Sequence, residues 1–191
     1  MGSSRERILD GVVRVLVRDG VDRLRIRAVA AEAGVSVGAV QHSFATRNDM
    51  VHAAMGHVSA QITARLLGGV SRERRPEENL RSACLLLAGT EDEDRPSTVV
   101  WLAFTSLACT DPKLAEAHQS AWRTLETGLL DLLRRAVPDR DADDAAELLA
   151  FVDGIAVARA TEPERMPADR ADRLISRFVH RLCTTPNPTD A

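Results

Sequence analysis

The sequence lacks the apolar segments on which membrane and secreted proteins depend. Its longest run free of Asp, Glu, Lys, Arg and His spans residues 96–110, which is too short to cross a bilayer as a helix. Charged residues between Arg5 and Asp10 leave no apolar core of the signal-peptide kind near the start of the chain. We therefore expect a cytoplasmic protein with no membrane partner.

Cysteine is also scarce. The three residues, Cys84, Cys109 and Cys183, are odd in number, far apart and set within apolar helical patterns. Such cysteines are typical of buried thiols in a reducing compartment and not of a disulfide framework.

Motifs of catalysis and metal binding are missing as well. The chain has no glycine-rich phosphate loop, no nucleophile elbow and no zinc-ligand spacing. His52 and His57 are five residues apart, so they point to different faces of one helix, and no cysteine pair accompanies them. We expect neither an enzyme nor a cofactor or metal site. A helical enzyme with a hydrophobic pocket is the alternative.

Charge is unevenly distributed, although the formal net charge is only −3. Residues 1–47 hold eight arginines and five acidic residues, a charge of +3, whereas the remainder holds 17 basic and 23 acidic residues, a charge of −6. A basic head on an acidic body suggests that the head alone binds a polyanion, with chance as the alternative explanation. The acidic body argues against a nonspecific architectural DNA protein, which needs a far more basic surface.

Apolar residues recur at helical spacing along the whole chain, and no segment has the alternation of a strand. Capping residues, prolines and glycines divide the pattern into about nine helices, so the sequence predicts an all-α protein. We expect a three-helix helix-turn-helix domain at residues 1–47, a helical ligand-binding and dimerisation domain at residues 48–185, and a tail at residues 186–191. The acidic run Glu91–Asp94 is expected to be a solvated helix start.

The segment "AEAGVSVGAVQHSFATR", Ala31–Arg47, has two glycines four residues apart and little apolar surface to bury. Two short helices joined by Gly34-Val35-Ser36 have the form of a helix-turn-helix, whose second helix enters the DNA major groove. Gly34 would end the first helix and Ser36 would cap the second. The segment would bury little protein surface because its partner is DNA. An ordinary helical corner, with Gln41 merely solvated, is the alternative.

The outer side of this second helix suits base reading. Val40 and Phe44, one turn apart, would hold the helix on its neighbours, while Gly38 would let it sink into the groove. Gln41 can pair bidentately with adenine, and Val37 can contact a thymine methyl. Four of the candidates lie where phosphates would pass, namely Arg27, His42, Thr46 and Arg47. The full set of candidate DNA-binding residues is Arg27, Ser36, Val37, Gly38, Gln41, His42, Thr46 and Arg47.

Residues Arg7–Met50, which include "RAVAAEAGVSVGAVQHSFATRNDM", closely resemble the DNA-binding domain of the TetR family of transcriptional regulators. The resemblance implies sequence-specific binding of double-stranded DNA. Four positions depart from the family's usual pattern. Tyrosine is usual at Gln41, histidine at Ser43 and lysine at Arg47, and a Ser or Thr cap is usual near Arg25. The arginine preserves the usual charge, whereas Ser43 lacks the phosphate contact of a histidine.

Two later segments, "WLAFTSLACTDPKLAEAHQ" and "LLAFVDGIAVARATEPERMP", resemble the carboxy-terminal domain of the family's BetI-like branch. The resemblance implies a homodimer formed by the last two helices and an inducer pocket in each subunit. Apolar stripes on those helices offer more surface than one subunit obviously needs. The candidate interface residues are Leu148, Val152, Ile155, Leu174, Phe178 and Leu182.

Candidates for the ligand pocket are apolar residues with a few polar groups among them. They are Trp101, Phe104, Cys109, His118, Trp122 and Asp153. The two tryptophans are preferred, because aromatic residues make up only 3% of the chain. For each candidate, a place in the core is the alternative, and Asp153 would either orient a ligand cation or lie at an interface edge.

Together these features predict a homodimeric transcriptional regulator, most simply a repressor of a palindromic operator. An unidentified small-molecule inducer would release it by preferring the state that does not bind DNA.

Overall fold

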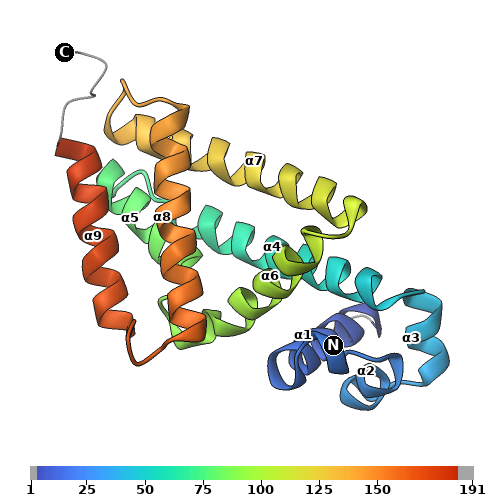
Figure 1. Ribbon diagram of the computed structural model, residues 1–191. Helices are drawn as coiled ribbons and strands as arrows, with labels where there is room; N and C mark the ends of the chain where they lie inside the picture. The colour runs from blue at the N-terminus through green and yellow to red at the C-terminus, as the bar shows by residue number, and fades with distance from the viewer. Residues whose placement is uncertain (1–3, 185–191) are drawn as a thin grey trace. The chain divides into compact units, whose positions relative to one another are not determined.

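The computed structural model of the chain describes residues 4–184 and is helical throughout (Figure 1). In that range nine α-helices and two 3₁₀ helices occur and no strand, which confirms the all-α prediction. The elements are α1 (Ser4–Asp19), η1 (Val21–Arg23), α2 (Ile26–Ala33), α3 (Val37–Ser43), α4 (Arg47–Gly69), α5 (Pro76–Leu87), η2 (Asp92–Asp94), α6 (Arg95–Ala108), α7 (Pro112–Ala136), α8 (Ala142–Thr161) and α9 (Ala168–Thr184).

The helices pack as two compact units. The first contains the described residues up to Gln61 together with Pro96–His118, and the second contains Ile62–Arg95 together with the described residues from Gln119 onward. The first part of α4 and nearly all of α6 thus pack with the helix-turn-helix. The domain boundary at residue 47 stays a prediction, and the expected tail at 186–191 lies outside the described residues.

In the first unit, α1 lies against α2 at close range. A Cβ atom on Gly11 would lie 3.0 Å from the Ala33 Cβ, so a larger residue there would push the two helices apart by a few tenths of an ångström. Beside it, Glu32 accepts from Arg14 Nε and from Arg18 Nη1, each at 2.7 Å. Arg18 first, and then Arg14, lower the pKa of the Glu32 carboxyl by hydrogen bonding. Two of the head's arginines therefore serve the fold.

Side-chain caps define the starts of α4 and α7. The Thr46 N–H donates to Asp49 Oδ2 at 3.0 Å and the Asp49 N–H to Thr46 Oγ1 at 3.1 Å, which forms a capping box at the start of α4. Asp111 Oδ1 accepts from the Lys113 and Leu114 N–H groups at the start of α7. Helix boundaries of this kind follow from local chemistry and are therefore readable in the sequence.

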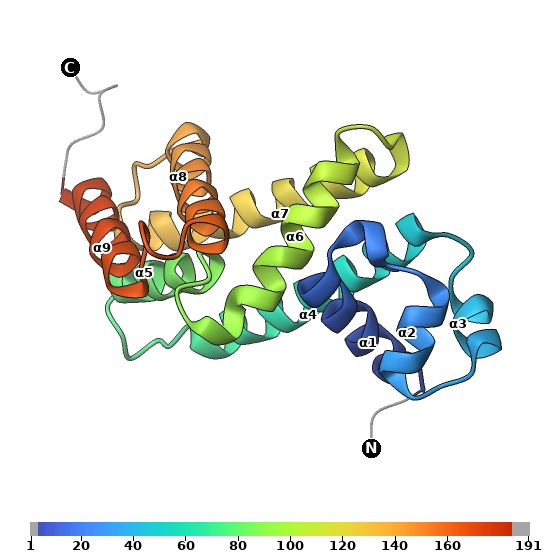
Figure 2. The ribbon, with the colours of Figure 1, turned by 60° about the horizontal axis from the view of Figure 1, so that its bottom comes forward.

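The second unit has a continuous apolar core in which α9 lies beside α8 and α5, as Figures 1 and 2 both show. Phe151 of α8 stacks on Phe178 of α9 with ring centroids 4.2 Å apart. Arg159 donates to the carbonyl oxygens of Gly89 and Thr90 at 3.3 and 3.0 Å, which fastens the turn after α5 to α8.

Two expectations about burial are wrong. Asp94, expected in a solvated acidic run, is 2% exposed and pairs with Arg65. Cys109, expected to be buried, is exposed because α6 ends at Ala108 and leaves it in the following turn. Cys84 is buried as predicted, and burial raises the pKa of its thiol to about 12.

Candidate nucleic-acid interface

The turn between α2 and α3 has the geometry of a helix-turn-helix. Gly34 adopts the left-handed conformation, with φ 63°, and its N–H bonds back to the last turn of α2. Ser36 Oγ then accepts from the Ala39 N–H at 3.2 Å and caps α3. Arg25, where the resemblance makes a Ser or Thr cap usual, makes no side-chain capping bond. α3 then runs from Val37 to Ser43.

α3 is held by one face and exposed on the other. Val40 is fully buried and Phe44 is 4% exposed, as predicted for the two anchors. Val37, Gly38 and Gln41, by contrast, are exposed. Since a Cβ on Gly38 would meet only Ser36 Oγ, at 4.0 Å, the fold itself does not require glycine there. Its small size leaves the outer face of α3 open.

All eight candidate DNA-binding residues are exposed, but their local partners differ. Arg27, in the first turn of α2, forms no ion pair among the described residues. Arg47 lies 3.6 Å from Asp22 Oδ1, an acceptor that is itself almost fully exposed. Thr46 serves the capping box of α4 through its hydroxyl. Their roles toward DNA stay predictions.

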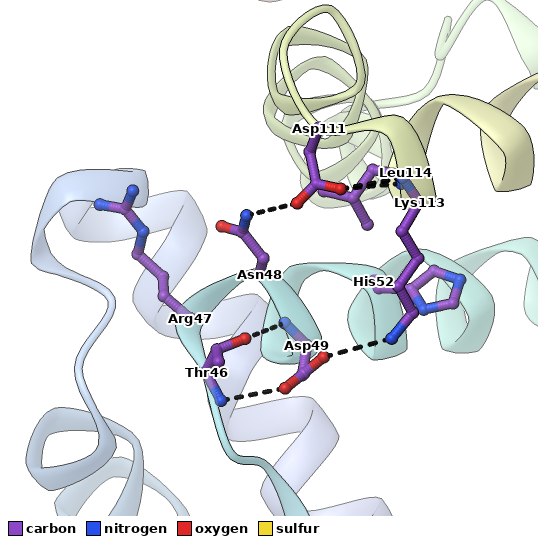
Figure 3. A pocket seen from close by; sticks show the side chains of 8 residues that line it. All are labelled: Thr46, Arg47, Asn48, Asp49, His52, Asp111, Lys113 and Leu114. Carbon is purple, nitrogen blue, oxygen red and sulfur yellow. Dashed lines mark hydrogen bonds and ion pairs between the residues drawn. The ribbon is translucent and has the colours of Figure 1, made fainter.

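A polar cluster that the sequence did not reveal lies behind Thr46 and Arg47. Figure 3 shows Asn48 directed toward Asp111 and Lys113 toward Asp49, with Arg47 pointing away. Asn48 Nδ2 donates to Asp111 Oδ2 at 2.8 Å, and Lys113 Nζ lies 3.7 Å from Asp49 Oδ1. These contacts tie the first turn of α4 to the start of α7 around a hollow of about 370 Å³.

Hydrogen bonds and the charge of Lys113 lower the pKa of both carboxyls in this cluster. The hydrogen bond from Asn48 is the largest cause that lowers the pKa of Asp111. The bond from Thr46 is the largest cause that lowers the pKa of Asp49, with Lys113 adding to it. The cluster arises from residues distant in sequence, and no local pattern marks it. The sequence also did not reveal the contact of Arg5 with Phe44, because these residues are far apart along the chain. The Arg5 guanidinium lies over the Phe44 ring, 5.7 Å from the centroid.

The ligand-pocket candidates of the first unit are only partly brought together. The buried Phe104 ring stacks on His118 and on His52, with centroids 5.9 and 6.1 Å away. Desolvation lowers the pKa of His118, which favours its neutral form. Trp101 is half-buried, and the exposed Cys109 lies beyond the end of α6.

The two candidates of the second unit are direct partners. The Trp122 indole of α7 hydrogen-bonds the Asp153 carboxyl of α8, and both side chains are partly buried. Burial raises the pKa of Asp153 to about 7, and the bond from Trp122 opposes that rise. A carboxyl beside an indole, able to lose its proton near neutrality, is suited to an organic cation.

The candidate interface residues are mostly used within one subunit. Leu148, Val152 and Ile155 are at most 5% exposed, and Phe178 and Leu182 are below 10%. Only Leu174 keeps a half-buried position. The expectation that these stripes exceed the needs of one subunit is therefore wrong, because they form its own core against α5 and α7.

No helix between residues 4 and 184 is long and apolar enough to span a bilayer. In the same range no group of three or more His, Cys, Asp or Glu side chains is arranged to hold a metal ion.

Comparison with known proteins agrees with this geometry. The family profile "Bacterial regulatory proteins, tetR family" matches residues 8–54, and the profile "BetI-type transcriptional repressor, C-terminal" matches residues 76–184. The chain is 31% identical over 185 residues to the HTH-type transcriptional regulator PksA of Bacillus subtilis, covering 94% of this chain and 89% of PksA.

Solved structures extend the comparison. A transcriptional regulator from Rhodococcus sp. Rha1 superposes with a TM-score of 0.86 at 30% identity, over 96% of this chain and all of that one. A regulator from Saccharomonospora viridis, solved in complex with choline, has a TM-score of 0.83 at 22% identity, over 92% of this chain and 95% of that one; it shares the fold. The protein belongs to the TetR family of bacterial transcriptional regulators, with a carboxy-terminal part of BetI type.

Proposed function

We propose that the protein is a homodimeric repressor that binds a palindromic operator through α3 and is released by a small organic cation. The exposed face of α3 carries the DNA-binding part of the proposal. Gln41 projects from a capped helix whose outer side is otherwise small, which is what entry into a major groove requires. Arg27, His42, Thr46 and Arg47 then contact the flanking phosphates, while Ser36 holds the amino-terminal end of α3.

The proposed dimer forms through the outer faces of α8 and α9. Along α8, Ala150, Gly154 and Val157 are exposed at intervals of four and three residues and therefore share one face. Val157 is 38% exposed, and a Cβ on Gly154 would meet nothing within 4 Å in its own subunit. A helix of the partner subunit would fill this open, apolar face. Half-buried Leu174 extends the surface onto α9.

The proposed inducer site is built around Trp122 and Asp153. An ionised Asp153 supplies the counter-charge and the indole face supplies a cation–π surface. The complex of the Saccharomonospora viridis regulator with choline makes choline the first compound to test. An inducer acts only through its preference for the state that cannot bind DNA, so its effect is bounded by that difference in affinity.

Selection of bound sequences from a pool of random DNA duplexes tests the central proposal. A palindromic consensus, with two half-sites separated by about one helical turn or a multiple of it, is expected for a symmetric dimer. Enrichment of a single asymmetric site would contradict the proposed dimer. Enrichment of no sequence at all would contradict sequence-specific binding.

A further inference from the structure

A hollow in the second unit is lined by three arginines and no acidic residue. It lies where the loop between α4 and α5 meets the last turns of α7 and has a volume of about 220 Å³. We call it the arginine hollow. It is lined by Val70, Ser71, Arg72, Arg74, Pro76, Asn79, Leu132 and Arg135. The basic lining is unexpected in a part of the chain with an excess of acidic residues.

The loop that carries two of the arginines is fixed by a buried amide. Asn79 is 8% exposed; its Nδ2 donates to the Ser71 carbonyl oxygen at 2.8 Å and its Oδ1 accepts from the Ser71 N–H at 3.1 Å. The Ser71 hydroxyl in turn accepts from the Glu73 N–H at 3.2 Å. The backbone on either side of Arg72 is thus held before any ligand arrives, which reduces the ordering cost of binding.

The guanidinium groups keep most of their hydrogen-bonding capacity. Among the residues that the structure describes, Arg72 and Arg135 form no ion pair and no side-chain hydrogen bond, and Arg74 donates only to the Gly69 carbonyl oxygen, at 3.3 Å. The nearby Glu78 is already paired with Arg75 at 2.7 Å. Three like charges around one hollow repel one another, and an anion between them would relieve that repulsion.

Size and geometry select the kind of anion. The hollow is smaller than the roughly 300–1,000 Å³ of pockets for drug-sized ligands, so it fits a compact charged group. A planar carboxylate is satisfied by one guanidinium fork, whereas a tetrahedral phosphate offers oxygens in several directions, as three separate arginines require. We propose that the arginine hollow binds the phosphate group of a small molecule, at a site distinct from the Trp122–Asp153 pair.

The proposal is tested with inorganic phosphate as the probe. Full-length protein is titrated at constant ionic strength, with amide resonances followed by NMR and sodium chloride as the balancing salt. We expect saturable shifts confined to residues 70–79 and 132–136. Arg72→Gln and Arg135→Gln should each weaken binding by about tenfold, since each removes a charge-assisted contact. Arg123→Gln removes the same charge from another exposed position of α7 and should leave binding unchanged.

Three results would overturn the proposal. One is a change in the amide resonances that does not saturate with phosphate, or that is equal in the parent and all three variants, which would mean general ion screening. Another is equally tight binding of acetate, which would assign the hollow to carboxylates. The third is a loss of operator affinity in Arg72→Gln and Arg135→Gln with a flatter salt dependence, which would assign these arginines to the DNA backbone. Since phosphate binding is measured without DNA, failure of the repressor proposal leaves this test intact.

Discussion

The indole N–H of Trp122 donates a hydrogen bond to the carboxyl of Asp153, joining α7 to α8 inside the second unit. Burial raises the pKa of this carboxyl to about 7, from an ordinary value of 3.8. Its charge is therefore set by the pH and by whatever cation approaches it. Stability and inducer binding should both reveal this titration.

Asp153→Asn should make the protein less sensitive to pH. Because the pKa is higher in the folded than in the unfolded state, the folded state binds the proton more tightly, and its stability falls as the pH rises from about 4 to about 7. Asparagine resembles the protonated carboxyl and does not titrate, so the variant should not lose this stability. The unfolding free energy of the variant minus that of the parent should therefore increase from pH 4 to pH 7 and stay constant above pH 7. Urea unfolding at intervals of pH measures the difference.

Asp131→Asn is the matched control for that experiment. It removes a carboxyl from an exposed position of α7 and so controls for the loss of one acidic side chain. If the unfolding free energies of Asp153→Asn and of the parent differ by the same amount from pH 4 to pH 8, the Asp153 carboxyl ionises with its ordinary pKa.

Binding of choline should tighten as Asp153 loses its proton. Below pH 7 the cation must displace that proton, which weakens binding by up to about tenfold per pH unit, and above pH 7 the affinity should level off. Tryptophan fluorescence at several pH values reports the binding. Asp153→Asn should abolish the pH dependence and Trp122→Ala should blunt the response, both with operator affinity unchanged.

If the ligand lowers the affinity for the operator by some factor, the operator must lower the affinity for the ligand by the same factor. A typical coupling of about 1–3 kcal/mol corresponds to roughly 5–150-fold in affinity, in both directions. Organic cations that bind beside Trp122 and Asp153 yet leave operator affinity untouched would exclude an inducer role for this site.

The sequence predicted the helices because their ends depend on local chemistry. Ser36, the Thr46–Asp49 box and Gly34 act within a few residues of their own positions, so their structure follows from spacing alone. The anchoring of α3 by Val40 follows in the same way from the helical period.

Burial and long-range pairing could not be predicted in this way. An apolar stripe such as that of α8 has the same pattern whether it faces its own subunit or a partner, and only the packing of α5 and α9 decides. The bond of Asn48 to Asp111 and the convergence of Arg72 with Arg135 join residues more than sixty positions apart. The burial of Asp94 could not be predicted because its partner Arg65 comes from another helix.

Gln41→Ala should relax sequence preference without harming the fold. The side chain is exposed and bonds to no described residue, and alanine is a better helix former. Removing a bidentate base contact costs roughly 1–3 kcal/mol at one or two base pairs per half-site. Affinities for the operator, for single-base variants and for a nonspecific duplex measure the effect. Equal weakening toward all of them would make Gln41 a phosphate contact or a structural residue.

Arg47→Gln should weaken binding to every duplex and lower the slope of log affinity against log salt by roughly one for each phosphate that the guanidinium neutralises. Its contact with Asp22 is long and solvent-exposed, so folding should change little, within about 1 kcal/mol. Arg14→Gln is the control, because Arg14 is engaged with Glu32 and its replacement removes the same charge from the head. If both variants have the parent's slope, Arg47 does not contact a phosphate. Arg27→Gln should behave as Arg47→Gln does.

Val157→Glu should separate the subunits. The side chain is 38% exposed on the outer face of α8, next to the open space at Gly154, so a carboxylate is solvated in the monomer. In the proposed dimer the same carboxylate is buried without a partner, at a cost of several kcal/mol counted over two copies. Sedimentation should then find folded monomers, and operator affinity should fall because two half-sites are no longer bound together.

Leu67→Glu is the control, since Leu67 is 74% exposed on α4 and should tolerate the charge in a dimer. Phe178 does not serve this purpose, because it is 7% exposed and a charge there would disrupt its stacking on Phe151 inside the subunit. A Val157→Glu protein that remains dimeric with full operator affinity would exclude this face of α8 from the interface.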